Sequence, residues 1–228
     1  MKIERRLDGA VTLLDLRLDC RSVAEENVLC TVESSMKAQL TERGDIFNLL
    51  NVLDELKHLK RTGWVKFNIP EPETVACHMY RMAVLAMLLD NDCDRAKCIR
   101  MTLVHDLGEA IIGDITPRCG ISATEKHRLE DVAMKKIMEM VPSTVGEDWY
   151  SLWQEYEANE TKEAKIVKHL DKFDMIVQAS HYEQKYGIDL EEFFTTTKDS
   201  FTLEPFMSWN EELRMKRYIR KNATQENN

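Results

Sequence analysis

The chain has 228 residues, of which 43% are hydrophobic and 31% are charged, and its formal net charge is −9. This composition is that of a globular protein with a full core, and the negative charge argues against a nucleic acid polymer or an acidic membrane as partner. The longest apolar run, 82–89, is too short to span a bilayer, and six cysteines without a C-x-x-C pair favour a reducing, cytoplasmic compartment.

The first 44 residues differ from the rest of the chain. Residues 13–20, LLDLRLDC, alternate apolar and polar side chains with the period of a β-strand. Because a single strand is not stable by itself, we treat 1–44 as an N-terminal extension of uncertain structure.

The remaining sequence predicts an all-α domain over 45–221, followed by a disordered tail at 222–228. Glycine and proline are sparse, with 8 and 5 residues, and apolar residues recur at helical spacing. We expect helices at 46–60, 74–89, 95–112, 122–140, 149–157, 161–186 and 208–221, with a loop at 62–72.

Capping signals support several of these boundaries. Asp94 is a typical N-cap, and the S-x-x-E pattern of a capping box occurs at 122–125 and again at 208–211. Thr161 can open the long sixth helix, and Gly187 can end it.

The stretch 103–114, LVHDLGEAIIGD, places polar side chains in an apolar helix. On a continuous helix His105 and Glu109 are four residues apart and share a face, while Asp106 lies on the predicted core-facing stripe with Leu103. A buried carboxylate costs several kcal/mol unless a cation pairs with it. The sequence therefore requires a partner for Asp106.

Two other predicted helices also turn polar residues toward the core. His78 shares a stripe with Met82 and Leu89, and Asp171 shares one with Met175. Each residue alone is more often a satisfied core residue or a cap, but together with His105 and Asp106 they favour a metal. Two imidazoles and two carboxylates suit one divalent ion, such as Mn, Co, Fe, Zn or Mg.

Several separated segments resemble one family. LKRTGWV (59–65), PETVACHMYRMAVLAML (72–88), LVHDLGEAIIGDITP (103–117) and EAKIVKHLDKFDMIVQASHYE (163–183) are similar to motifs of the HD-domain metal phosphohydrolases. The closer resemblance is to the HD-domain 5′-deoxynucleotidase family, with its YfbR-like bacterial branch and its eukaryotic HD domain-containing protein 2 branch. The chain resembles the eukaryotic branch over about residues 45–205.

This resemblance implies a helical HD-domain bundle with a buried metal, and a homodimer. It implies hydrolysis of deoxyribonucleoside 5′-monophosphates to deoxynucleoside and phosphate. It carries over three groups of residues, namely the metal ligands His78, His105, Asp106 and Asp171, the catalytic residues Glu109 and Asp114, and the substrate-binding residues Arg61 and Trp64. Glu109 would be the general acid, Arg61 would bind the phosphate, and Trp64 would pack on the deoxyribose.

Alternatives stay open at this point. The same site could serve an HD phosphohydrolase of another nucleotide or phosphomonoester, or the chain could be a non-catalytic nucleotide-binding or scaffold protein. Asp114 could bind the sugar hydroxyl or order Glu109, and Trp64 could be a hydrophobic plug. Cys77 replaces an acidic residue of the family, and Gly108 is expected to leave room for a substrate.

Overall fold

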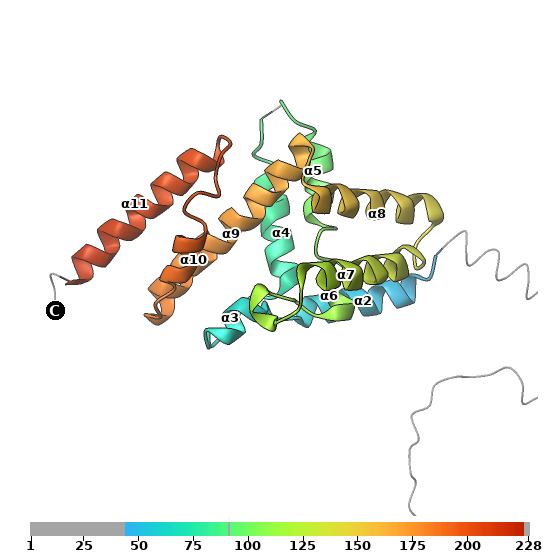
Figure 1. The fold of residues 1–228 in the computed structure, drawn as a ribbon, viewed down its shortest axis with the longest axis horizontal. Helices are drawn as coiled ribbons and strands as arrows, with labels where there is room; N and C mark the ends of the chain where they lie inside the picture. Colours follow the sequence, from blue (N-terminus) through green and yellow to red (C-terminus); the bar gives the residue numbers. More distant parts are fainter. Residues whose placement is uncertain (1–43, 91, 226–228) are drawn as a thin grey trace, which may run out of the picture. The chain divides into compact units, whose positions relative to one another are not determined.

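The computed structural model describes residues 44–90 and 92–225, and this part of the chain is all-α, as predicted (Figure 1). The predicted strand at 13–20 lies outside the described residues. Within them, one isolated bridge joins Lys60 and Thr74. The helices, with the labels of Figure 1, are α2 (Ile46–His58), α3 (Thr62–Lys66), α4 (Val75–Ala86), α5 (Arg95–Thr102), α6 (Glu109–Ile112), the 3₁₀ helix η1 (Pro117–Cys119), α7 (Ala123–Met138), α8 (Ser143–Ala158), α9 (Lys162–Tyr186), α10 (Glu191–Thr196) and α11 (Phe206–Gln225).

The long helix α9 is the centre of the packing. It contacts α4, α5, α8, α10 and α11. Helix α6 does not belong to this group and contacts α2 and α7. The core between these helices is closed by fully buried side chains such as Met82, Met101, Trp153, Leu170 and Ile176. Because α9 contacts so many helices, polar residues on its inner face are held in fixed positions.

Most helix starts follow the predicted caps. The carboxylate of Asp94 accepts the N–H of Lys97 at 2.9 Å, and Ser122 and Thr161 cap α7 and α9 in the same way. Gly187, with φ at +67°, ends α9 in the left-handed conformation. These side chains satisfy N–H groups that the first helical turn cannot.

The predicted helix 95–112 is wrong as a single helix. It ends at Thr102 and resumes at Glu109, and between them the backbone forms i→i+3 hydrogen bonds such as Glu109 N–H to Asp106 O at 3.1 Å. Turns of this kind contain three residues rather than 3.6, so the buried face shifts. Leu103, expected in the core, is therefore 44% exposed, and Val104 is buried instead.

Two short helices depart from the predicted loops. The predicted loop 62–72 contains α3, whose first N–H, from Thr62, is accepted by the distant Asp114 carboxylate at 2.7 Å. Helix α10 was not predicted, because six residues carry too little periodicity to be recognised. Both helices border the site described below.

Three boundaries also differ from the prediction. Helix α8 begins at Ser143 rather than 149, and α11 begins at Phe206, so Ser208 lies inside its first turn. Both the N–H and the hydroxyl of Ser208 donate to Glu204, which replaces the predicted capping box. Helix α11 runs to Gln225, so the first four residues of the predicted disordered tail are helical.

The contacts of Arg217 on α11 are expected to stabilise the fold strongly. It pairs with both oxygens of the buried Glu183 on α9 at 2.7 Å, and its guanidinium lies 3.8 Å from the Phe194 ring centroid. Replacing Arg217 with Ala leaves Glu183 without its main partner, so the free energy of unfolding should fall by about 3 kcal/mol in urea titrations. Lys216→Ala, which breaks the exposed Lys216–Glu212 pair, should cost less than about 0.5 kcal/mol, and equal losses would contradict the role of Arg217.

Candidate metal centre

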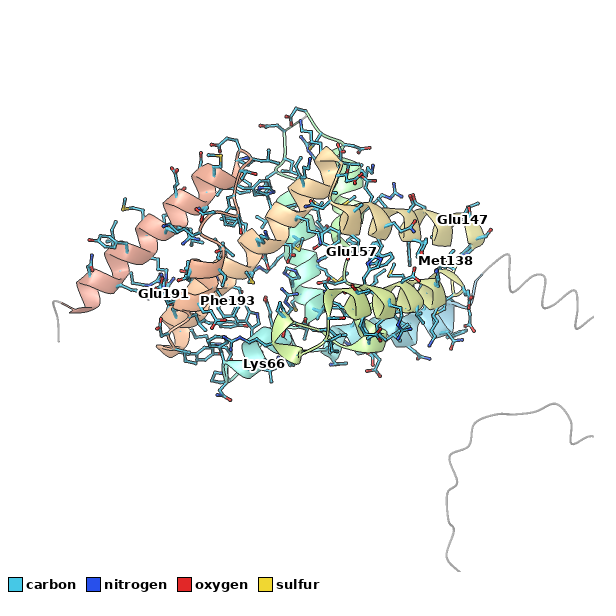
Figure 2. All side chains as sticks on the ribbon, viewed as in Figure 1. Lys66, Met138, Glu147, Glu157, Glu191 and Phe193 are labelled. Carbon is cyan, nitrogen blue, oxygen red and sulfur yellow. The ribbon has the colours of Figure 1, made fainter. Side chains whose placement is uncertain are left out.

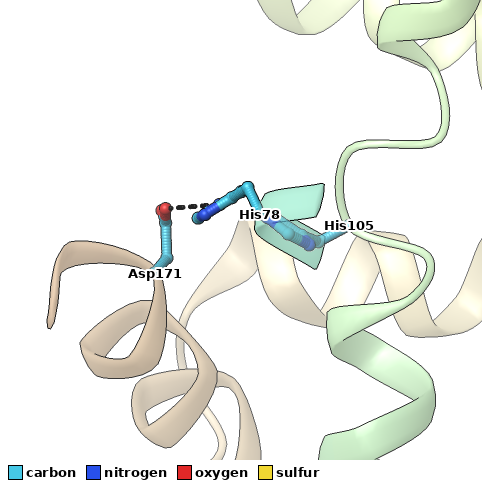
Figure 3. A group of neighbouring side chains, drawn as sticks. All are labelled: His78, His105 and Asp171. Carbon is cyan, nitrogen blue, oxygen red and sulfur yellow. Dashed lines mark ion pairs between the residues drawn. The ribbon is translucent and has the colours of Figure 1, made fainter. Parts of the chain in front are cut away.

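Three elements bring His78, His105 and Asp171 to one point (Figure 3). His78 comes from α4, His105 from the turns after α5, and Asp171 from α9. One ligand atom of each residue lies within 4.8 Å of the other two, and His78 Nε2 lies 3.2 Å from Asp171 Oδ1. The structure therefore brings together three of the four predicted ligands as a possible cation site.

The imidazole of His78 is oriented by a buried carboxylate. Its Nδ1 lies 2.8 Å from Oδ2 of Asp174, which is fully buried and also pairs with Arg81 at 2.8 Å. A carboxylate only accepts, so Nδ1 carries the hydrogen and Nε2 is left to face Asp171.

The charge on His78 depends on these two aspartates. Burial and Arg61 lower the pKa of His78, but the contacts with the carboxylates of Asp171 and Asp174 outweigh them and raise it to about 9. A cation that binds at Nε2 has to displace this proton, so metal binding is coupled to pH.

The imidazole of His105 is oriented in a similar way. Its Nδ1 donates to the carbonyl of Thr102 at 2.9 Å, and its side chain is completely buried. Its Nε2 therefore keeps a free lone pair and lies 3.1 Å from Asp106 Oδ2, without the alignment of a hydrogen bond.

The two Nε2 atoms show whether these residues suit a metal ion. Neither His78 Nε2 nor His105 Nε2 makes a hydrogen bond among the described residues, although both are buried. Unpaired buried nitrogen atoms are costly, and a cation between them would remove that cost. The residues present therefore fit a divalent ion.

Asp106 lies beside this group and contacts it through His105. Its Oδ2 also lies 3.4 Å from Nη1 of Arg61, the N-cap residue of α3. Burial raises the pKa of Asp106, but the neighbouring His105 and the charge of Arg61 hold it well below its usual range. Asp106 is therefore an ionised carboxylate at the edge of the site.

Asp171 is ionised for the same reason. Burial raises its pKa, but the close contact with His78 and its charge hold it well below its usual range. The hydroxyl of Tyr156 donates to its second oxygen at 3.0 Å. Both predicted carboxylate ligands thus carry the negative charge that a metal needs.

Glu109 is the most deeply buried of the predicted catalytic groups. It is 4% exposed, and its Oε2 makes no hydrogen bond among the described residues. Burial and the negative charges of Asp106 and Asp114 raise its pKa well above the usual value. The environment therefore favours the protonated form of this side chain.

Asp114 has a visible structural contact. Gly113, with φ at +80°, turns the chain after α6, and the Asp114 carboxylate accepts the N–H of Thr62 at 2.7 Å. This contact holds the start of α3, and therefore Arg61, next to the metal centre.

Trp64 mainly fills space in the hydrophobic core. It is 2% exposed, its Nε1–H donates to Glu73 at 2.9 Å, and its ring packs on Tyr182 and Phe193. Together with Arg61 it lines a cavity of about 370 Å³, so only a small part of the indole faces that space.

Three supporting residues were missed by the sequence reasoning. Asp174 follows Asp171 by three positions on α9, a spacing that places both on one face and could have identified it. Tyr156 and Glu73 had no such signal, because each acts through a partner distant in sequence. The expected space beside Gly108 is wrong, since a Cβ there would lie 3.5 Å from Ala133 on α7.

Two further features lie outside the centre. Cys77 precedes His78 but is exposed, so its thiol does not join the ligands.

A second group, His127, Glu130 and Glu157, could also hold a cation. Its carboxylates already pair with lysines 126 and 168, so its charge is largely balanced.

Known proteins are similar to this chain in sequence and in fold. A family model described as an HD domain matches residues 53–205. The 5′-deoxynucleotidase HDDC2 of Mus musculus is 45% identical over 161 residues, which cover 69% of this chain and 80% of the mouse protein. The 5′-deoxynucleotidase YGK1 of Saccharomyces cerevisiae is 39% identical over 171 residues, 72% of this chain and 79% of the yeast protein. A solved structure of a conserved hypothetical protein from Pyrococcus furiosus gives a TM-score of 0.63 at 31% identity, over 74% of this chain and 99% of that one.

Asp174 is expected to control metal affinity without binding the metal. Asp174→Asn keeps the volume but removes the charge that orients His78, so affinity for Mn²⁺ should fall about 10- to 100-fold in calorimetric titration of the metal-free protein. Asp148→Asn, in an exposed pair with Arg100, is the matched control and should leave affinity unchanged. Wild-type affinity in the Asp174 variant would show that this carboxylate does not orient the ligand.

Proposed function

The chain belongs to the HD-domain family, and from that premise we propose that it is a metal-dependent 5′-deoxynucleotidase. In this reaction a deoxyribonucleoside 5′-monophosphate is hydrolysed to the deoxynucleoside and phosphate. The observation that carries the proposal is the pair of buried Nε2 atoms of His78 and His105, which face two ionised carboxylates beside a buried arginine. The names of the mouse and yeast relatives support the same activity.

We assign the metal to four candidate ligands, His78, His105, Asp106 and Asp171. When bound, a divalent ion polarises a phosphate oxygen and lowers the pKa of a water ligand. The contribution of the protein is to hold the two imidazoles in fixed tautomers, through Asp174 and the carbonyl of Thr102. The N and O donor set fits Mn, Co, Fe, Zn or Mg.

Arg61 is the candidate phosphate-binding residue. Its side chain is 14% exposed and lies beside Asp106, so its guanidinium is next to the metal centre but still reachable. A guanidinium can bind two phosphate oxygens at once. Asp114 supports this function by holding the adjacent N–H of Thr62.

Glu109 is the candidate proton donor. Burial and two neighbouring carboxylates raise its pKa, which favours the protonated form. Cleavage of the P–O5′ bond leaves an alkoxide that needs a proton, and a buried carboxylic acid nearby can supply it.

The net charge and the exposed apolar side chains bear on the partners of the protein. The net charge of −9 favours free nucleotides over nucleic acid polymers. No helix in the described part is long and apolar enough to cross a membrane. We propose a cytoplasmic homodimer. Exposed apolar side chains on α4 and α11, such as Tyr80, Tyr218 and Ile219, support the dimer. A monomer in light scattering would contradict the dimer.

A phosphate-release panel tests the proposed activity. Deoxyribonucleoside monophosphates, ribonucleoside monophosphates, deoxyribonucleoside triphosphates and cyclic nucleotides should be compared with and without EDTA. We expect release from the deoxyribonucleoside monophosphates, loss of that release with EDTA, and recovery when divalent metal is restored. Release only from another phosphate ester would indicate a different phosphohydrolase, and no release from any would indicate a binding protein.

Glu109→Gln tests the proton donor. Glutamine keeps the shape but cannot donate an acidic proton, so kcat should fall about 10²- to 10⁴-fold while metal content stays unchanged. Glu125→Gln, on the exposed start of α7, is the control and should retain full turnover. Full activity in the Glu109 variant would rule out its role as the acid.

A further inference from the structure

The cavity beside Arg61 has more space than a phosphate needs. It measures about 370 Å³ and lies between α3, the chain that follows α6, and α10. Arg61 and Asp114 border it on the side of the metal centre. Its volume is within the range of small-molecule sites.

One wall of the cavity is aromatic. Phe193 on α10 faces α3, and its ring centroid lies 4.6 Å from that of Trp64 and 5.1 Å from that of Phe67 (Figure 2). Trp64 is buried, whereas Phe67 and Phe193 are only partly buried. Their rings therefore leave apolar surface available to a planar ligand.

The outer rim of the cavity carries one ion pair. Arg118 in η1 pairs with Glu192 in α10, and the guanidinium carbon of Arg118 lies 5.1 Å from the Phe67 ring centroid. The two side chains are 52% and 48% exposed. Exposed pairs of this kind contribute little to folding, so a ligand that displaced this pair would cost the protein little stability.

We propose that this cavity binds the nucleobase of the substrate, with Phe193 as the stacking surface, Phe67 as the adjoining apolar wall, and Arg118 and Glu192 at the base edge. The inference rests on the proposed 5′-deoxynucleotidase function. If Arg61 holds the phosphate, the sugar and base extend from it into the adjoining cavity. Aromatic side chains stack on any base, because each base has a π face.

The rim pair fits the edge chemistry of a base. Arg118 only donates hydrogen bonds and Glu192 only accepts them. All four bases present a donor next to an acceptor on their pairing edge, so this pair can contact each of them. The cavity is therefore expected to bind the four bases without strong preference.

A substrate without a base separates this site from the phosphate site. The four deoxyribonucleoside monophosphates should be compared with methyl 2-deoxyribofuranoside 5-phosphate, which keeps the sugar and the phosphate ester. Arg118→Ala should raise KM for all four nucleotides about tenfold, with kcat and the kinetics of the baseless ester unchanged. Phe193→Leu, which keeps apolar volume but loses the ring, should act in the same direction.

Arg100→Ala is the matched control. Arg100 pairs with Asp148 across two helices, with exposures of 49% and 43% close to those of the rim pair, but it does not line the cavity. Its kinetics should equal those of the wild type with every substrate. Thermal melting checks that each variant is folded.

The outcomes distinguish this inference from the function on which it rests. If wild-type protein hydrolyses the nucleotides but Arg118→Ala and Phe193→Leu change KM for neither substrate, or for both equally, the cavity is not the base site. If wild-type protein hydrolyses no deoxynucleotide with metal present, the proposed function fails, and the base site fails with it. A higher KM for the nucleotides alone supports both.

Discussion

The structure depends on the concentration of negative charge in its interior. Asp106, Asp171 and Asp174 converge on two histidines, with Arg61 and Arg81 as the nearby permanent cations. Buried charge is tolerated only when it is paired. Two of the aspartates face imidazole nitrogens that make no hydrogen bond among the described residues, so a bound cation would complete the pairing. The packing of α4, α5 and α9 serves to hold these groups together.

A continuous chain of polar contacts links this centre to the neighbouring cavity. Trp64 donates to Glu73, Glu73 pairs with Arg81, Arg81 pairs with Asp174, and Asp174 accepts from His78. The wall of the cavity and the imidazole that faces the metal position are therefore fixed by the same network. Such a network is rigid only when every member is satisfied, which explains why buried polar residues cluster on this side of the core.

The sequence predicted the parts of the site that sit on long helices. His78 and Asp171 were visible because each interrupts a regular apolar stripe, and Thr161 and Gly187 marked the ends of α9. Helices α3 and α10 were missed because stretches of five and six residues have no measurable period. The box at 208–211 failed because Glu204, which precedes α11, accepts from Ser208 and the helix begins earlier. Local patterns thus identified candidate ligands and caps, whereas contacts between distant segments determined α3, α10 and the start of α11.

The predicted helix 95–112 is interrupted after α5, and this interruption affects the chemistry of the candidate site. In a continuous helix the carbonyl of Thr102 would accept the N–H of Asp106, four residues later. In the structure α5 ends at Thr102, and this carbonyl accepts from Nδ1 of His105 at 2.9 Å. The hydrogen on Nδ1 leaves Nε2 of His105 to face Asp106 at 3.1 Å. Asp106 and Glu109, three residues apart, would share a side on either kind of helix, and burial together with the Asp106 charge raises the pKa of Glu109. The break in the helix therefore coincides with the contact that orients a candidate metal ligand.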